Sequence, residues 1–246
     1  MTALSFDSGS VPEPTRAGAQ SIDRALAVLD CFAATSGLSV TAAAQRLGLP
    51  VSTTHRIVQS LVRGGLLERE GRSGRYRVGA GAAVLAGASF AQLGVHTVAP
   101  HLYALAAGIG ITASFAVARD TDAITVFSAV PPVRYCHRQL PAPRQAIGAS
   151  AAGQVMLAFT RLDLAAARGD VSGAALDDVR RRGYARVVTG DDTLAVAVPI
   201  PSADHGRPGA LTVQASVRRM SNRQIHRMVP LMHRTATLIG HANRKG

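Results

Sequence analysis

The chain is poor in several residue types, and each shortage argues against a class of protein. It has no Trp, and Phe, Tyr and Trp make up 4% of its 246 residues, which argues against recognition of single strands by base stacking. Its two cysteines, Cys31 and Cys136, give neither a disulfide framework nor a CxxC metal site, a usage typical of the reducing cytosol. Lysine occurs once, at Lys245, so lysine-based catalysis has no candidate within the body of the chain. No basic cluster followed by an apolar run opens the sequence, so we expect a cytoplasmic protein without a secretory signal.

Positive charge is abundant and is carried by arginine. There are 27 basic and 15 acidic residues, a formal net charge of +12. The planar guanidinium fork suits phosphates and guanine edges, so a polyanionic partner is indicated, although a GC-rich genome produces the same bias. With 47% hydrophobic residues, the chain can bury one or two cores.

Residues 78–118 carry no charged side chain and are long enough to span a membrane. The segment is built from Ala, Gly, Ser and Thr, and it includes Gln92, His96 and Pro100. Because small residues supply little transfer energy, we expect no membrane span, and we expect small-residue helices packed closely against another helix.

The N-terminal third follows the order of a winged helix–turn–helix. Residues 1–20 show no periodicity and are predicted to form a disordered tail. A first helix is expected from the capping residue Ser21. A second would begin at the cap Ser39 and end at Gly48, and a third would enter at Pro50.

A basic hairpin is predicted after the third helix. Residues 66–69 and 75–78 form two short β-like runs around a glycine-rich loop. Between Ser39 and Val78 there are seven arginines and two glutamates, a local net charge of 7 − 2 = +5. Tyr76 alternates with arginines and is therefore expected to pack inward against Leu67.

The C-terminal part has a different texture, with β-rich runs in pairs and helices between them. This pattern predicts an α+β sheet domain separate from the first. Hairpin connections are expected at Asp120-Thr121-Asp122 and Asp204-His205-Gly206. Strands are predicted at 111–118, 123–130, 194–200 and 209–217, and helices at 79–93, after Pro100, and at 151–159, 174–182 and 221–242.

Together, several fragments make residues 21 to about 242 resemble the IclR family of bacterial transcriptional regulators. The N-terminal fragments are Ser21–Leu26, Leu38–Thr41, Leu47–Arg56 and Ser73–Gly79, and the C-terminal ones are Ala151–Ala158, Arg182–Tyr184 and Ala197–Ile200. The resemblance implies a winged helix–turn–helix domain (21–79), a linker helix (80–96) and a GAF-like α/β effector-binding domain (97–246). It also implies a homodimer or tetramer that binds double-stranded DNA and a small-molecule effector, with no cofactor.

The third predicted helix is the expected recognition helix. Its first turn would place Val51 against a thymine methyl group, where many relatives carry a basic residue. Ser52 and Thr53 would also point into the groove, although hydroxyls at a helix start can equally satisfy free helix amides without any DNA. Arg56 can bind guanine with two hydrogen bonds, and the hairpin arginines would contact phosphates. The full set of predicted DNA-binding residues is Ser39, Val51, Ser52, Thr53, His55, Arg56, Arg69, Arg72, Arg75 and Arg77.

The resemblance places the effector between the sheet and the segment around Gly148. Relatives that bind small carboxylates carry cysteine or serine at positions occupied here by Ala195, Thr212 and Gln214, and Gln154 replaces a common lysine. These changes favour a more neutral or larger ligand. The predicted effector-binding residues are Ala149, Ser150, Asp192, Ala195, Thr212 and Gln214.

Two other function classes were weighed. An enzyme is disfavoured, because Gly148–Gly153 has Ala152 where a GxSxG nucleophile elbow needs glycine, and because His226 and His233 lack a third metal ligand. A ligand-independent or architectural DNA-binding protein is the alternative reading. Its cue is the acid-free basic C-terminal segment: Arg218, Arg219, Arg223, Arg227, Arg234, Arg244 and Lys245.

Overall fold

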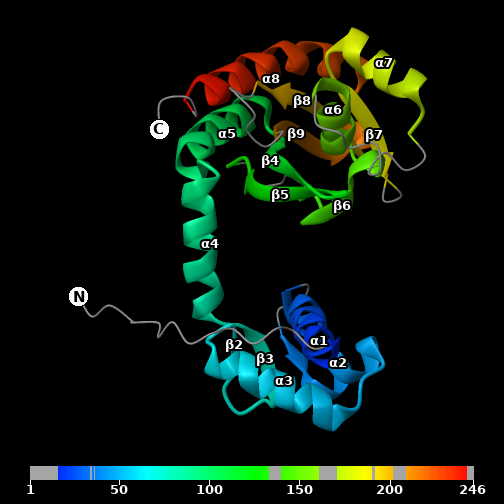
Figure 1. Ribbon diagram of the computed structural model, residues 1–246. Coiled ribbons are helices and arrows are strands. Elements are labelled where there is room, and N and C mark those ends of the chain that lie inside the picture. The colour runs from blue at the N-terminus through cyan, green and yellow to red at the C-terminus, as the bar shows by residue number, and fades with distance from the viewer. Residues whose placement is uncertain are drawn as a thin grey trace. The chain divides into compact units, whose positions relative to one another are not determined.

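The computed structural model describes residues 16–33, 35, 37–132, 140–160, 171–189, 192–201 and 209–242. The chain separates into two compact units, Met1–Ser89 and Phe90–Gly246. The first is helical with a small sheet, and the second is built on a larger sheet, so the predicted α+β class is confirmed (Figure 1).

Up to Val78, the described residues of the first unit form three helices and a three-stranded antiparallel sheet of order β1-β3-β2. The strand β1, which the sequence did not predict, pairs with β3 through Leu38 opposite Tyr76. The elements are α1 (Arg16–Ala33), β1 (Leu38–Ser39), α2 (Val40–Leu47), α3 (Val51–Arg63), β2 (Leu67–Arg69) and β3 (Arg75–Val78).

Local chemistry explains the helix–turn–helix. The Ser39 hydroxyl caps α2 by accepting a hydrogen bond from the Ala42 N–H at 3.2 Å. Gly48 ends α2 in the left-handed conformation (φ 62°), and Pro50 supplies the residue before α3. Tyr76 is buried in the same apolar cluster as Leu67, so its predicted inward orientation is confirmed.

The disordered tail predicted for residues 1–20 extends too far towards the C-terminus. Helix α1 begins at Arg16, so residues 16–20 are helical, while residues 1–15 lie outside the described residues. Ser21 suggested a later start because it is a good cap, but Ala17, Ala19 and Gln20 are helix formers and extend the helix.

Two helices share the uncharged segment, α4 (Ala80–Gln92) and α5 (Val95–Ile109), with a break at Gly94 (φ 64°). No single helix among the described residues is long and apolar enough to cross a membrane, and α4 and α5 meet that test only as a bent pair. Close packing is confirmed for α5, which packs against α8, but is wrong for α4, where no residue is buried. Helix α4, at the position of the predicted linker helix, therefore ends at Gln92, before the predicted residue 96.

The second unit is built on a six-stranded antiparallel sheet of order β6-β5-β4-β9-β8-β7. The four predicted strands are confirmed within one residue at each end, and β6 and β7 were missed. The left-handed Asp120 (φ 52°) lies in the predicted β4–β5 connection, whereas the predicted turn at 204–206 is outside the described residues. The strands are β4 (Thr112–Arg119), β5 (Asp122–Ala129), β6 (Arg144–Ala146), β7 (Ala185–Thr189), β8 (Thr193–Ile200) and β9 (Gly209–Ser216).

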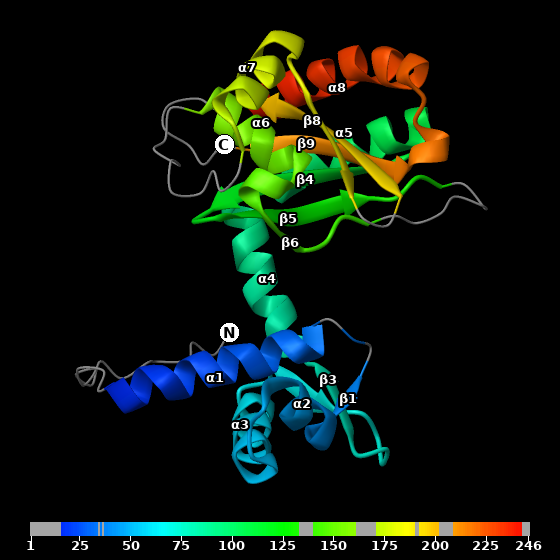
Figure 2. The same ribbon diagram turned by 90° about the vertical axis from the view of Figure 1, so that its right-hand side faces the viewer.

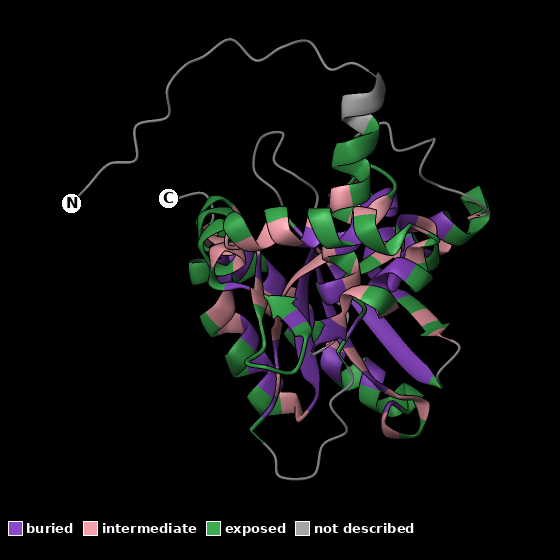
Figure 3. Cartoon of the chain, turned by 90° about the horizontal axis from the view of Figure 1, so that it is seen from below, coloured by how far each residue is buried: buried purple, intermediate pink, exposed green. Residues whose placement is uncertain are grey.

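Helices cover both faces of this sheet, which makes a three-layer unit. Helices α5 and α8 (Asn222–Ala242) enclose one apolar cluster, and α6 (Ala151–Phe159) with α7 (Gly173–Arg182) encloses the other. Strands β4, β8 and β9 in the middle of the sheet are largely buried, whereas β5, β6 and β7 are mostly half-buried or exposed; purple marks the buried residues in Figure 3. His233 on α8 is half-buried, and burial lowers its pKa, an effect that a hydrogen bond to the Gly183 backbone opposes.

Glycine allows α6 to approach the 3₁₀ turn Ile147–Ala149 that precedes it. A Cβ built on Gly153 would lie 1.9 Å from the Ile147 carbonyl oxygen, closer than any real side chain allows. By contrast, a Cβ on Gly108 in α5 would meet nothing within 4 Å.

We therefore expect Gly153→Ala to lower the free energy of unfolding by about 1–3 kcal/mol or more, because backbone must move. Gly108→Ala is the matched control, and it should raise stability by about 0.5–1 kcal/mol. Chemical denaturation followed by circular dichroism measures both. Equal stability of the two variants would contradict the close approach.

Candidate DNA-binding surface and ligand cavity

The start of α3 presents polar side chains outward. Val51, Ser52, His55 and Arg56 are exposed and Thr53 is half-buried. Within the described chain, the hydroxyls of Ser52 and Thr53 have no hydrogen-bond partner, so they do not serve as helix caps. Both hydroxyls can therefore form hydrogen bonds with a binding partner.

An open groove runs beside this surface, between α1 and α3, with a volume of about 520 Å³. Thr53 and Arg56 line one wall, together with Ser60. Arg24 and Ser21 line the other wall, from α1. The sequence prediction missed Arg24 and Ser60, although Arg24 could have been found as a basic residue close to the predicted cap of the first helix.

The predicted wing arginines fall into two groups. The Arg77 Nε lies 2.7 Å from Glu68 Oε1, and the Arg75 Nε lies 3.8 Å from Glu70 Oε2. Arg75 also donates to the Gly37 carbonyl at 2.6 Å. Arg69 and Arg72 are exposed and have no partner in the described chain. Of the four, Arg69 and Arg72 are therefore the ones that offer an unpaired charge.

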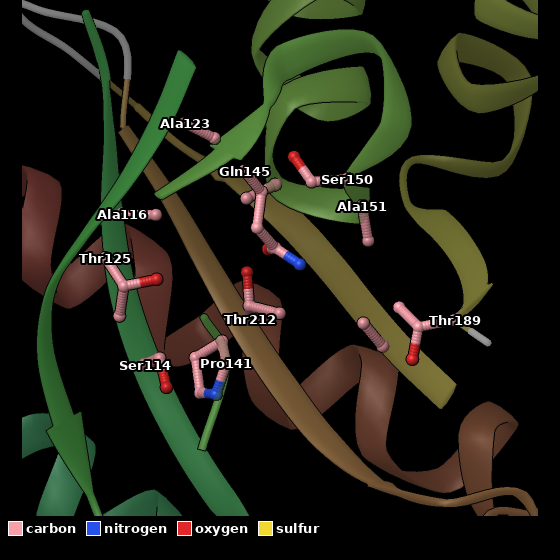
Figure 4. A pocket seen from close by; sticks show the side chains of 12 residues that line it. Ser114, Ala116, Ala123, Thr125, Pro141, Gln145, Ser150, Ala151, Thr189 and Thr212 are labelled. Atoms are coloured by element: carbon pink, nitrogen blue, oxygen red, sulfur yellow. The ribbon is translucent and has the colours of Figure 1, made fainter. Parts of the chain in front are cut away.

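A second feature is a small cavity between the six-stranded sheet and the start of α6 (Figure 4). The open space within it is about 10 Å³, enough for a single water-sized sphere. None of its lining residues is charged: Ser114, Ala116, Ala123, Thr125, Pro141, Gln145, Ser150, Ala151, Ala152, Thr189, Ala195 and Thr212.

One hydroxyl in this cavity lacks a partner. Thr212 is 5% exposed, and its Oγ1 has no hydrogen-bond partner among the described residues. Its cross-strand neighbour Ser114 is satisfied, with 2.9 Å between the Ser114 and Ser128 hydroxyl oxygens. The Ser150 hydroxyl accepts from the Gly153 N–H at 3.0 Å, so it caps α6. Among the hydroxyls that line the cavity, that of Thr212 is thus the unused one.

The structure brings three of the six predicted effector residues, Ser150, Ala195 and Thr212, to the cavity. Ala149 and Asp192 are exposed and do not line it. Gln214 also lies outside the lining, with its Nε2 3.5 Å from the Leu140 carbonyl oxygen. The residues missed by sequence reasoning lie mainly on β4, β5 and β6, because their alternation marks a sheet face without indicating which positions border a cavity.

The helix–turn–helix region matches known proteins. Residues 21–71 match the family model of the IclR helix–turn–helix domain. The HTH-type transcriptional regulator BhcR of Paracoccus denitrificans is 33% identical over 154 residues, which are 60% of this chain and 53% of BhcR. The chain thus spans about half the length of this curated relative.

Solved structures match most of the chain. An IclR transcriptional regulator from Alicyclobacillus acidocaldarius has a TM-score of 0.74 and 22% identity, covering 91% of this chain and 98% of that one. An IclR homologue from Microbacterium hydrocarbonoxydans, solved with 4-hydroxybenzoate, has a TM-score of 0.74 and 20% identity, with 92% and 100% covered. At these identities the likeness establishes the fold.

The unpaired Thr212 hydroxyl leads to a stability prediction. Thr212→Val removes it while keeping the side-chain shape, and should raise the free energy of unfolding by about 1 kcal/mol, because an unsatisfied buried hydroxyl costs roughly 1–3 kcal/mol. Ser114→Ala breaks a satisfied pair and should lower stability by about 1 kcal/mol. Urea denaturation compares the two. Equal destabilisation would mean that the Thr212 hydroxyl already has a partner.

Proposed function

We propose that this chain, which belongs to the IclR family, is a ligand-responsive transcriptional regulator. The DNA-binding domain comprises residues 21–79 and binds operator DNA, and a linker helix (80–96) connects it to the second domain. That domain, residues 97–246, binds a small effector and assembles the chain into a homodimer or tetramer in the cytoplasm. The observation that carries the proposal is the exposed start of α3, whose hydroxyls and Arg56 have no partner in the described chain.

In this proposal α3 enters the major groove with its N-terminal turn foremost. Val51 contacts a thymine methyl group, and Ser52 and Thr53 donate to base edges or phosphates. Arg56 forms two hydrogen bonds with a guanine, and His55 lies beside it for a base or phosphate contact.

The wing then follows the DNA backbone. Arg69 and Arg72 bind phosphates directly, since no carboxylate of the described chain neutralises them. Arg75 and Arg77 bind phosphate only at the expense of their ion pairs with Glu70 and Glu68, and therefore contribute less. Ser39 supports the surface by capping α2.

The cavity of the second unit is proposed as the effector site, bordered by Ser150, Ala195 and Thr212. Ala149, Asp192 and Gln214 remain proposed contacts for an effector that extends beyond the cavity. A structural neighbour binds 4-hydroxybenzoate, which supports a small organic ligand. Because the lining residues are uncharged, desolvating a carboxylate there is unfavourable, and we favour an uncharged ligand with hydrogen-bonding groups. At about 10 Å³, the cavity must open for it.

Assembly into a homo-oligomer is supported by exposed apolar side chains. Ile22 and Leu26 on α1 are 60% and 56% exposed, and Val84 and Leu85 on α4 are 74% and 63% exposed. Burying such side chains against a second copy is favourable.

Arg56→Ala should weaken binding to the operator by about 1–3 kcal/mol and alter base preference, because a bidentate guanine contact is lost. Arg63→Ala is the matched control, since Arg63 lies at the other end of α3 and donates to Ser60. Gel-shift titration on DNA adjacent to the gene measures both. Unchanged affinity of the Arg56 variant would remove Arg56 from the site.

The neutral-ligand proposal is tested with a matched pair, 4-hydroxybenzoate and 4-hydroxybenzamide, in a thermal-shift assay. Ligand that binds the folded protein raises its melting temperature. We expect a larger shift from the amide, and a smaller amide shift for Thr212→Val than for the parent chain. Stabilisation by the acid alone would contradict the proposal.

A further inference from the structure

Helix α8 carries a row of arginines on its outer side, which we call the α8 arginine stripe: Arg223, Arg227 and Arg234. All three are exposed. At about 100° per residue, spacings of four and seven residues place them within roughly 40° of one another around the helix. At about 1.5 Å rise per residue the stripe is about 16 Å long. Helix α8, red to orange in Figure 2, forms an outer layer of its unit.

The stripe is not neutralised by the chain. In the described part of the molecule, none of its guanidinium groups has an ion-pair or hydrogen-bond partner, and Arg218 just before α8 is likewise unpaired. No acidic residue occurs after Asp204 in the sequence. A helix face that is merely solvated commonly alternates charges of both signs, and α8 does not.

Other exposed arginines of the same unit contrast with the stripe. Ion pairs with aspartates hold five of them: Arg119, Arg144, Arg180, Arg181 and Arg182. Arginine abundance from genome composition would not by itself separate the two groups. The carboxylates lie at the hairpins and α7, and α8 is left with positive charge alone.

Charge also decides the kind of partner. A second copy docking through the same face would bring arginines against arginines, as a two-fold interface requires. Moreover, of the five aspartates that the structure describes in this unit, Asp120, Asp122, Asp177 and Asp178 are already held in ion pairs, and Asp192 alone could not match three arginines of a second copy. The partner must bring its own dense negative charge.

We propose that the α8 arginine stripe binds the phosphate backbone of DNA as a second, sequence-independent contact. Guanidinium groups bind phosphate oxygens through paired hydrogen bonds, and duplex DNA carries about one charge per 1.7 Å of axis, so a 16 Å stripe faces several phosphates. The inference rests on the proposed function, because the DNA is that held by the helix–turn–helix.

The test uses the full-length chain and a 60-base-pair duplex centred on the footprinted site near the gene. Fluorescence anisotropy gives the affinity of R223Q/R227Q/R234Q from about 50 to 300 mM KCl. The slope of log K against log salt is negative, and each lost phosphate contact makes it shallower by about 0.9. For the triple variant we therefore expect a slope about 2.7 smaller in magnitude and at least tenfold weaker binding at low salt.

Two further variants isolate the effect. R119Q/R144Q/R181Q removes the same net charge from ion-paired positions of the same unit and should show the salt slope of the parent chain. R223K/R227K/R234K keeps the positive charge of the stripe and should show most of the parent's salt slope. Because the stripe is exposed, melting temperatures should match that of the parent chain.

Equal slopes for the stripe and control variants would overturn the inference. The inference would also be overturned if the parent chain bound poly-L-glutamate, the stripe variant did not, and both had the same affinity for DNA. That result would assign the stripe to an acidic protein. Failure of the parent chain to bind any fragment from the gene's vicinity is a separate result, because it contradicts the proposed function itself.

Discussion

Pairing between arginine and carboxylate side chains shapes the chemistry of the described surface, because it neutralises some exposed arginines and leaves others without a partner. With 27 basic against 15 acidic residues, carboxylates cannot pair with every arginine. The ion-paired carboxylates of the described residues lie at the wing, the β4–β5 hairpin and α7. The charge left unpaired includes that at the start of α3, on the wing at Arg69 and Arg72, and along α8. The net charge of +12 therefore does not by itself locate a binding surface; the surface is located by the arginines that have no carboxylate partner.

The two faces of the large sheet differ in the size of their side chains. Towards α5 and α8 the strands present residues such as Leu194, Val196 and Leu211, which are fully buried. Towards α6 they present residues such as Ala116, Ala195 and Thr212. Helix α6 covers this face, and Gly153 lets its first turn lie against the Ile147 carbonyl of the preceding 3₁₀ turn. The Thr212 hydroxyl lies on this small-residue face, where it lines the cavity and has no hydrogen-bond partner among the described residues.

Sequence reasoning recovered the elements whose signals are local. Ser39 and Gly48 mark the ends of α2, and the alternation of Tyr76 with arginines gives the inner face of the wing. Non-local features were missed: β1 is two residues long and depends on pairing with β3, and β6 is three residues long at a sheet edge. The effector residues show the same division. Ser150, as a helix cap, lies at the cavity, whereas Gln214 and Asp192 lie outside its lining, because neither periodicity nor resemblance reports which side chains border a space. The ion pairs of Arg75 and Arg77 also depended on cross-strand register and on the conformation of the turn.

The central claim is that this chain binds a specific DNA site through the start of α3. DNase I footprinting of the full-length chain on the DNA adjacent to its gene tests it most directly. The account predicts a discrete protected segment with two related half-sites, since a homo-oligomer presents its recognition helices in pairs. Uniform protection that spreads with protein concentration, or no protection at all, would contradict it.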